Sequence, residues 1–403
     1  MTDKIPGRDQ YTEEARQQRL DWLRARTGTA LPSLDGGGVD ARALTGNLEN
    51  FAGTVAVPIG LAGPLLFTGD AAVGSVVAPL ATTEGALVAS ASRGARAITA
   101  AGGVTTKVLS QRMIRAPAFE FADIAAAARF TDWLRAHRPD LDEQVRLVSR
   151  HARLIDIDPY QLGRYLHVRF VFETADASGQ NMVTAATWQI FQWMQDTLAG
   201  DDGLRPEWMQ IEGNLSSDKK VSVTAMLAGR GNRVTAECRI PADVVESVLK
   251  CTPAALVKGH RLLVQGGQQA GVAGAGLNAV NMVAALFVAT GQDIACVHES
   301  GVSILSMEVD DGELIATLLL PSLVTGTVGG GTSLPNQRDW LTALGCAGAG
   351  GGARFAEIIA GFSLALDVST TAAMVSGHFA DAHQRLGRSR PVDQNLVPAS
   401  KPG

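Results

Sequence analysis

Residues 165–198 read YLHVRFVFETADASGQNMVTAATWQIFQWMQDTL, and this stretch decides the fold class. Every second residue from Leu166 to Phe172 is apolar, which predicts a half-buried strand over Tyr165–Glu173. A glycine-containing turn, Asp176–Asn181, follows the strand and opens a predicted helix near Met182–Leu198. A strand, a glycine turn and a helix in this order indicate an α/β (α+β) protein.

The sequence on either side of this unit divides the chain into regions. Residues 116–211 hold four of the six tryptophans and predict a small inserted domain. Residues 49–115 and 212–390 are similar to each other in being rich in small residues, which predicts that they form one large domain. An N-terminal arm, 1–48, and a loose tail, 391–403, complete the predicted organisation.

Periodicity and capping residues predict further elements. Thr82 and Thr83 cap an expected helix that runs to Ala100, with Glu84 in its first turn. The other expected helices are Thr12–Arg26, Asp123–His137, Asn278–Thr290 and Ala353–Arg385. The expected single strands are Thr54–Pro64 and Gln144–Ile157. One hairpin is expected from Val221–Ala228 and Arg233–Ile240, and a second from Ser303–Val309 and Glu313–Leu320.

Composition excludes several classes of protein. The 403 residues are 46% hydrophobic and 19% charged, which excludes wholesale disorder. A formal net charge of -5 argues against electrostatic binding to nucleic acid. The four cysteines form no C-x-x-C pair, which predicts a reducing compartment without a structural zinc site. A polar N-terminus and the lack of about 18 consecutive uncharged apolar residues predict a cytoplasmic protein without a membrane segment.

Well-known nucleotide and metal motifs are missing from the sequence. The glycine-rich stretches at Gly36 and Gly348 match the G-x-G-x-x-G pattern loosely, but no strand precedes them. The sequence contains neither G-x-x-x-x-G-K-[ST] nor H-E-x-x-H. These observations argue against an ordinary Rossmann domain, a P-loop and a zincin, and we expect no metal.

Charged residues that can carry chemistry occur at four places. Glu84 precedes Arg93 and Arg96, which share a helix face and can clamp a phosphate or carboxylate. The adjacent Lys219 and Lys220 repel each other unless an anion lies nearby. Each group also has a purely structural interpretation, as a helix-dipole carboxylate, a solvated arginine face or a hydrated loop.

The other two places lie nearer the C-terminus. Asp293 follows an apolar helix in a glycine-rich, uncharged setting, which predicts a raised pKa. His383 is a candidate general acid. A helix-terminal turn residue and a surface histidine are the structural alternatives. Two carboxyl groups, a lysine and a histidine together suit reduction of a thioester, which needs oxyanion stabilisation and protons for a thiolate and an alkoxide.

The ordered motifs resemble those of the 3-hydroxy-3-methylglutaryl-CoA reductase family over roughly residues 45 to 390. The matching segments are Glu49–Gly53, Pro58–Pro64, Ala81–Gly85, Asp176–Met182, Asp218–Lys220, Gly291–Asp293 and Gly326–Pro335. The resemblance implies a large domain with an inserted ferredoxin-like nucleotide-binding domain, and a homodimer with interfacial active sites. It also implies two hydride transfers from a nicotinamide cofactor to the acyl-CoA thioester, giving mevalonate and free coenzyme A.

The same resemblance implies roles for individual residues. Glu84 would donate the proton of the aldehyde step, and Lys219 would hold the carbonyl oxygen. Asp293 would tune both through hydrogen bonds, and His383 would protonate the coenzyme A thiolate. The implied substrate-binding positions are Arg93, Arg96, Arg115, Asp218, Lys220 and Asn281, with Glu212 and Asn278 in the same pocket.

The implied cofactor positions are Ser149, Arg150, Asp176, Gly179, Asn181, Val328, Gly329 and Arg388. An arginine beside a turn, as at Ser149-Arg150, suits a 2′-phosphate, so we expect NADPH rather than NADH.

Two departures from the family pattern concern the substrate pocket. Asn278 stands where the family usually has histidine, and Glu212 stands where it has a small hydroxyl residue. An added acid repels a substrate carboxylate unless a cation compensates it. A reductase of another acyl thioester, bound to coenzyme A or to a carrier protein, is therefore an alternative. A catalytically inactive ligand-binding relative is a further one.

Overall fold

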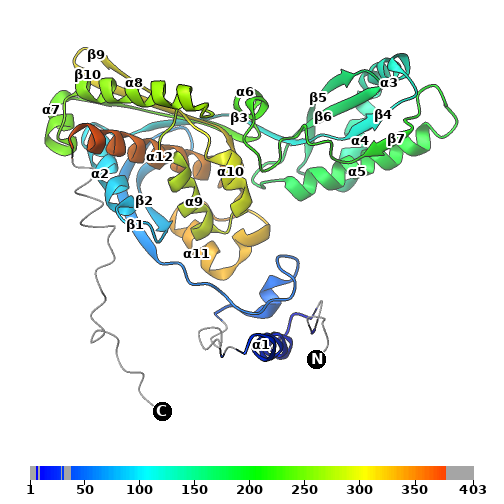
Figure 1. The fold of residues 1–403 in the computed structure, drawn as a ribbon, viewed down its shortest axis with the longest axis horizontal. Helices are drawn as coiled ribbons and strands as arrows, with labels where there is room; N and C mark the ends of the chain where they lie inside the picture. Colours follow the sequence, from blue (N-terminus) through cyan, green and yellow to red (C-terminus); the bar gives the residue numbers. More distant parts are fainter. Residues whose placement is uncertain (1–5, 8–9, 29, 31–37, 378–403) are drawn as a thin grey trace.

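One antiparallel sheet connects the two lobes of the molecule (Figure 1). The computed structural model describes residues 6–7, 10–28, 30 and 38–377. The path of the sheet is β7 (Trp208–Gln210), β4 (Ala118–Glu120), β6 (Tyr165–Glu173), β3 (Thr105–Arg115), β8 (Gly231–Ile240), β10 (Glu313–Leu323) and β9 (Ile304–Asp310), and β5 (Arg153–Leu162) pairs with β6.

Strand β3 belongs to both lobes. Its first part pairs with β8 in the large lobe, whereas Met113–Arg115 pair with β6 in the small lobe. Strand β4 continues along the same edge of β6 after Pro117, whose carbonyl accepts the Val168 N–H. Arg115 therefore lies where the two lobes join.

The small lobe packs three helices, α3 (Ile124–Ala136), α4 (Arg138–Val148) and α5 (Gln180–Thr197), with strands β4 to β7. Phe119 anchors an aromatic core, with its ring centroid 5.1 Å from that of Phe130 and 5.6 Å from that of Phe191. The predicted strand Tyr165–Glu173 is confirmed, and its alternating apolar side chains are buried. The strand is more than half-buried, however, because Arg169 and Val171 on the other face are buried as well.

The central element of the large lobe is α12 (Gly352–Val375), which packs against α2 (Leu87–Ala100), α9 (Ala279–Thr290) and β8. Helix α12 is long and apolar enough to cross a membrane, with a mean hydropathy of 1.7 over its most apolar 18 residues. However, 89% of that apolar segment is buried inside the molecule. A helix that is apolar all round is also what a protein core requires.

The remaining elements are α1 (Glu13–Thr27), β1 (Ile59–Thr68), β2 (Val73–Ala81), α6 (Val223–Ala228), α7 (Ala242–Val244), α8 (Pro253–Ala270), α10 (Val297–Ser300) and α11 (Pro335–Ala343), with short 3-10 or π turns at Ala41–Leu44, Val245–Leu249, Ile294–Cys296 and Gly330–Ser333. Most of them belong to the large lobe, whereas α1 and the turn at Ala41–Leu44 lie apart from it (Figure 1).

Several expected elements are confirmed, and others are displaced or wrong. The helices α1, α3, α5 and α9 and the β9–β10 hairpin lie within a few residues of their expected bounds. The strand expected at Gln144–Ile157 is confirmed only over residues 153–157, which belong to β5. Residues 144–148 belong to helix α4, because Leu141 and Val145 bury one helical face. The expected first strand is displaced to Ile59–Thr68.

Of the hairpin expected from Val221–Ala228 and Arg233–Ile240, only the second strand is confirmed, as β8. Val223–Ala228 is helical, because Ser222 caps it by accepting the Ala225 N–H at 3.0 Å. Helix α12 ends at Val375, and the rest of the helical run expected to Arg385 lies mostly outside the described residues.

Candidate active site

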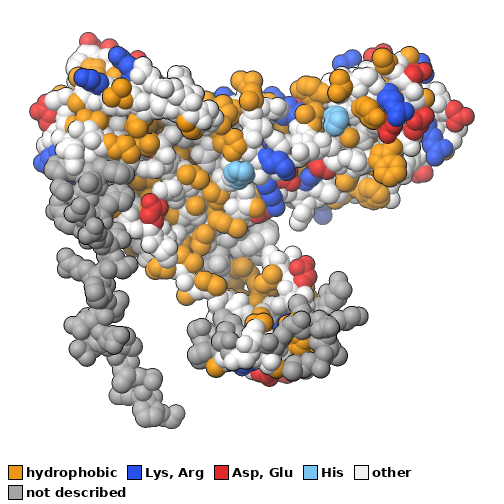
Figure 2. Space-filling model, in the orientation of Figure 1, with side chains coloured by type: hydrophobic (Ala, Val, Ile, Leu, Met, Phe, Trp, Pro, Cys, Tyr) orange, Lys and Arg blue, Asp and Glu red, His pale blue; other side chains and the backbone are white. Residues whose placement is uncertain are grey.

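Lys219 lies in the loop between β7 and α6. Figure 2 shows basic side chains on the surface between the two lobes. Three non-glycine residues of this loop, Asn214, Ser217 and Lys219, have left-handed backbones with φ of 68°, 54° and 58°. Each such residue costs about 1 kcal/mol or more. Surrounding contacts must therefore hold the loop in this shape.

Buried charges supply those contacts. Glu299 of α10 accepts the backbone N–H of Lys219 at 3.1 Å and also binds the guanidinium of Arg230. Arg230 is fully buried, and its second terminal nitrogen donates to Asp218 at 2.7 Å. The imidazole Nδ1 of His298 lies 3.2 Å from the Lys219 carbonyl oxygen. The lysine is thus anchored through its backbone, which leaves its ammonium free to point into the site.

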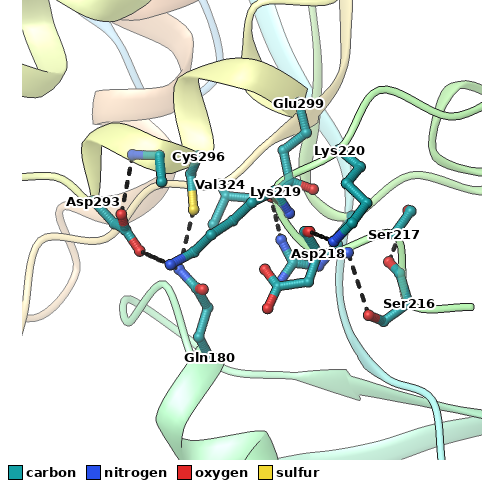
Figure 3. Close-up of polar contacts among 12 residues, drawn as sticks. Gln180, Ser216, Ser217, Asp218, Lys219, Lys220, Asp293, Cys296, Glu299 and Val324 are labelled. Atoms are coloured by element: carbon teal, nitrogen blue, oxygen red, sulfur yellow. Dashed lines mark hydrogen bonds and ion pairs between the residues drawn. The ribbon is translucent and has the colours of Figure 1, made fainter. Parts of the chain in front are cut away.

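The ammonium of Lys219 lies 2.9 Å from the carboxylate of Asp293 (Figure 3). This hydrogen bond raises the pKa of Lys219 against the opposing effect of burial. Burial acts to raise the pKa of Asp293, but the bond to Lys219 and its charge outweigh that effect, so the pKa of Asp293 is lowered. The expectation of a raised Asp293 pKa is therefore wrong, because the sequence did not show the neighbouring ammonium.

Gln180 and Cys296 complete the surroundings of the pair. The Gln180 amide, at the start of α5, donates to Asp293 at 3.4 Å and to the Cys296 sulfur at 3.1 Å. Burial raises the pKa of Cys296 to about 12. Its thiol is therefore protonated at neutral pH and unsuited to act as a nucleophile.

Glu84 lies in a different place. It precedes α2 rather than standing in its first turn, because Ala86, the residue before the helix, has a φ of 72° and the helix begins only at Leu87. The Glu84 carboxylate accepts from the side-chain amide of Asn281 at 3.1 and 3.3 Å. Its backbone N–H donates to Thr82 at 2.9 Å.

Glu84 and Lys219 occupy opposite ends of α9 within one chain. Asn281, the partner of Glu84, lies in the first turn of α9, and Asp293, the partner of Lys219, lies just beyond its last residue, Thr290. At 1.5 Å per residue, Asn281 and Thr290 are about 14 Å apart along the helix. A single chain therefore does not bring together the carboxyl group of Glu84 and the ammonium of Lys219. His383 lies outside the described residues.

The substrate-binding candidates fall into two groups. Around Lys219, Arg115 binds Glu212 at 3.0 Å and lies 3.6 Å from Asp218. Lys220 donates to the Asp218 carbonyl oxygen at 2.9 Å. These four residues are linked by contacts and lie in or beside the loop that carries Lys219.

The second group lies on α2 and near the start of α9. Arg93 and Arg96 line a cavity of about 560 Å³ together with Gly63 and Pro64. Arg93 is anchored there, because its guanidinium Nε donates to the Ser369 hydroxyl at 3.0 Å. Asn278 precedes α9, and its backbone N–H donates to the buried carboxylate of Asp367 at 2.7 Å.

The cofactor candidates gather around the start of α5. The Asp176 carboxylate accepts the N–H groups of Gly350 and Gly352 at 2.8 and 2.9 Å, so it ties two loops together. Gly179 has a φ of 81°, and a Cβ there would lie 2.4 Å from Thr174. Asn181 lies in the first turn of α5, which is not capped by any side chain in the described part of the chain.

The other cofactor candidates lie in two further loops. The Thr327 N–H donates to the Asp176 carbonyl oxygen at 2.8 Å, which places Val328 and Gly329 beside this turn. Ser149 ends α4 and accepts two backbone N–H groups, and Arg150 follows it with an exposed side chain. Arg388 lies outside the described residues.

Sequence reasoning missed Glu299, Arg230 and Gln180. Glu299 shortly follows Asp293 in the sequence, and Arg230 stands between two glycines, but nothing in their spacing linked either residue to Lys219. In the ranges that the structure describes, no three His, Cys, Asp or Glu side chains are grouped as metal ligands.

A sequence profile of hydroxymethylglutaryl-coenzyme A reductase matches residues 15–388. The chain belongs to this reductase family. The 3-hydroxy-3-methylglutaryl-coenzyme A reductase of Pyrococcus abyssi is 39% identical over 394 residues, which are 95% of this chain and 94% of that protein. The reductase of Haloferax volcanii is also 39% identical, over 93% of each chain.

Solved structures of the reductase family share the fold. A class II 3-hydroxy-3-methylglutaryl-CoA reductase from Streptococcus pneumoniae, bound to NADPH, is 20% identical with a TM-score of 0.67. The match covers 89% of this chain and 97% of that structure. The expected α/β fold is confirmed by this likeness.

Proposed function

We propose that this reductase-family protein reduces 3-hydroxy-3-methylglutaryl-CoA to mevalonate and free coenzyme A with NADPH. The observation that carries the proposal is the Lys219–Asp293 pair, whose ammonium and carboxylate lie 2.9 Å apart on a braced loop. Relatives that carry this reductase name match nearly the whole chain. The acyl-CoA thioester is the substrate class that the family assignment supports.

Lys219 would stabilise the oxygen of the reacting carbonyl. Negative charge develops on that oxygen when the thioester carbon accepts hydride, and again when the aldehyde carbon does. The pKa of Lys219 is raised, so the side chain stays a cation at neutral pH. A fixed cation needs no reorganisation as the charge develops, which is the basis of electrostatic catalysis.

Protons would come from two other side chains. Glu84 is placed by its two contacts with Asn281 and would protonate the alkoxide of the second reduction. His383, which lies outside the described residues, would protonate the departing thiolate. Asp293 would orient Lys219 and hold its charge.

The residues around the start of α5 suit an anionic dinucleotide. Helix α5 is 18 residues long, and its first-turn N–H groups, near Asn181, have no capping side chain among the described residues. A Cβ on Gly329 would meet no atom of this part of the chain within 4 Å, which leaves room for a ligand. Arg150 would bind the 2′-phosphate of NADPH. Two NADPH molecules, bound one after the other, would each supply the hydride for one of the two reductions.

Two copies of the chain would build each active site. Glu84 and Lys219 lie at opposite ends of α9, so the proposed chemistry needs a second copy to bring them together. A homodimer with active sites between its subunits satisfies this requirement.

We also propose a division of labour between the two lobes and a cellular location. Residues 116–211 would bind NADPH, and residues 49–115 and 212–390 would bind the acyl-CoA. The location would be cytoplasmic, because all four cysteines are unpaired, as expected in a reducing compartment.

The test is oxidation of NADPH by the purified protein with 3-hydroxy-3-methylglutaryl-CoA, with mevalonate measured as the product. Lys219→Ala should lower kcat by about a hundredfold or more, as loss of an oxyanion-stabilising group does. Lys107→Ala is the matched control, because Lys107 also pairs with an aspartate, Asp70, at 2.9 Å, but on the exposed start of β3. Absence of mevalonate with the unaltered protein would refute the proposal.

A further inference from the structure

The carboxylate of Glu212 is held at both oxygens by the chain itself. One oxygen accepts the backbone N–H of Asn214 at 2.7 Å. The other accepts the guanidinium of Arg115 at 3.0 Å and lies 3.4 Å from the Ala116 N–H. Donors from both sides therefore fix the negative charge of Glu212 in one place.

Arg115 is the cation that Glu212 neutralises. Its side chain is 10% exposed, and a second acid, Asp218, lies 3.6 Å from the same terminal nitrogen. The Nε of Arg115 is buried and has no hydrogen-bond partner among the described residues. The positive charge of Arg115 is thus compensated inside the protein before any ligand arrives.

This ion pair lies next to the catalytic lysine on two sides. Asp218 directly precedes Lys219 in the loop. On the other side, Arg115 contacts the Gln180 carbonyl oxygen at 3.5 Å, and the Gln180 side chain reaches Asp293 (Figure 3). An acyl group whose carbonyl oxygen contacts Lys219 therefore extends into the neighbourhood of the Arg115–Glu212 pair.

We propose that Glu212 is a specificity-determining residue that acts as the internal counter-ion of Arg115. It weakens the binding of an acyl group whose distal end carries a carboxylate, because that charge meets Glu212 instead of a free guanidinium. It admits acyl thioesters whose distal end is uncharged. The inference rests on the proposed function and concerns the acyl class that the same site accepts.

The other nearby cations do not remove this effect. Lys219 is paired with Asp293. Arg230 is paired with Asp218 and Glu299. Lys220 is exposed, and its ammonium donates to the Asp218 carbonyl oxygen at 2.9 Å. Exposed charges are screened by water, so Lys220 offsets the half-buried Glu212 only in part. Glu212 consequently sets the charge preference of the pocket.

The experiment compares two thioesters with saturating NADPH. One is 3-hydroxy-3-methylglutaryl-CoA, and the other is 3-hydroxy-3-methylbutyryl-CoA, which lacks the distal carboxylate. Glu212→Gln should lower KM for the carboxylated thioester by about tenfold, because removing one close charge frees Arg115. KM for the neutral thioester should stay within about twofold, because it gains no charge interaction. Glu212→Ser is the second variant, in case one of the two folds poorly.

Glu313→Gln is the matched control, because Glu313 pairs with Arg239 at 2.9 Å on strands away from Lys219. It should leave both KM values unchanged. Equal changes for the two thioesters in the Glu212 variants, or none, would overturn the inference. If the unaltered protein oxidises no NADPH with either thioester, the proposed function fails. Calorimetric binding of the two thioesters then still decides the charge preference.

Discussion

The Lys219 ammonium and the Asp293 carboxylate face each other at 2.9 Å across the junction of the 216–220 loop and the end of α9. The backbone of Lys219 is held separately, by Glu299. Glu299 therefore holds the position of the Lys219 backbone, and Asp293 stabilises the charge of its ammonium. This separation allows each contribution to be tested by its own substitution.

Asp293→Asn should lower kcat and shift its pH dependence. The hydrogen bond to Asp293 is the main cause that raises the pKa of Lys219, so the variant should lose the ammonium form at a lower pH than the unaltered protein. The basic limb of the kcat profile should move downward, and kcat at neutral pH should fall at least about tenfold. An unchanged basic limb would show that Lys219 does not depend on this carboxylate.

Glu299→Gln should alter the pH dependence of stability. Burial raises the pKa of Glu299 to about 7 from an ordinary 4.5, so between these values the folded state binds more protons than the unfolded state. The free energy of unfolding must therefore fall as pH rises through this window. The variant removes this contribution, whose upper limit is about 3 kcal/mol. Urea unfolding at pH 4.5 and pH 7.5 measures the difference, and parallel profiles would contradict the assignment.

Two glycine substitutions should have opposite effects on stability. A Cβ at Gly94 of α2 would lie 1.8 Å from the Ala365 carbonyl oxygen of α12, so Gly94→Ala should destabilise the protein by about 2 kcal/mol or more. Gly266 lies inside α8, and a Cβ there meets nothing within 4 Å in the described structure. Gly266→Ala should stabilise the protein by up to about 1 kcal/mol, because alanine favours helix. Thermal unfolding of both variants checks the pair, and a stable Gly94→Ala protein would refute the close α2–α12 packing.

The sequence predicted the elements with strong local signals. Alternating apolar residues identified β6, and the long apolar run ending at Gly291 identified α9. Sequence prediction failed where a single capping residue decided the structure. Ser222 starts helix α6, where a strand was expected. Local pattern cannot weigh a cap against a strand-like run of side chains.

The site shows the same limit. Resemblance to a family selected Lys219 and Asp293, and the structure places them in contact. No sequence pattern pointed to Arg230 or Glu299, because their role depends on burial and on contacts between distant segments. The expectation of a raised Asp293 pKa was wrong for the same reason. The ammonium of Lys219, which lowers this pKa, lies far from Asp293 in the sequence.

The assembly of the site from two chains is the central claim, and a hybrid dimer tests it most directly. Glu84→Gln and Lys219→Ala chains are co-expressed with different affinity tags, and the dimer that carries both tags is purified. If Glu84 of one copy serves Lys219 of the other, one of the two sites is intact and the hybrid keeps about half of the normal kcat. The control is a hybrid of the unaltered chain with a chain that carries both substitutions, and it should be inactive. The reverse result, an inactive first hybrid and a half-active control, would contradict the account.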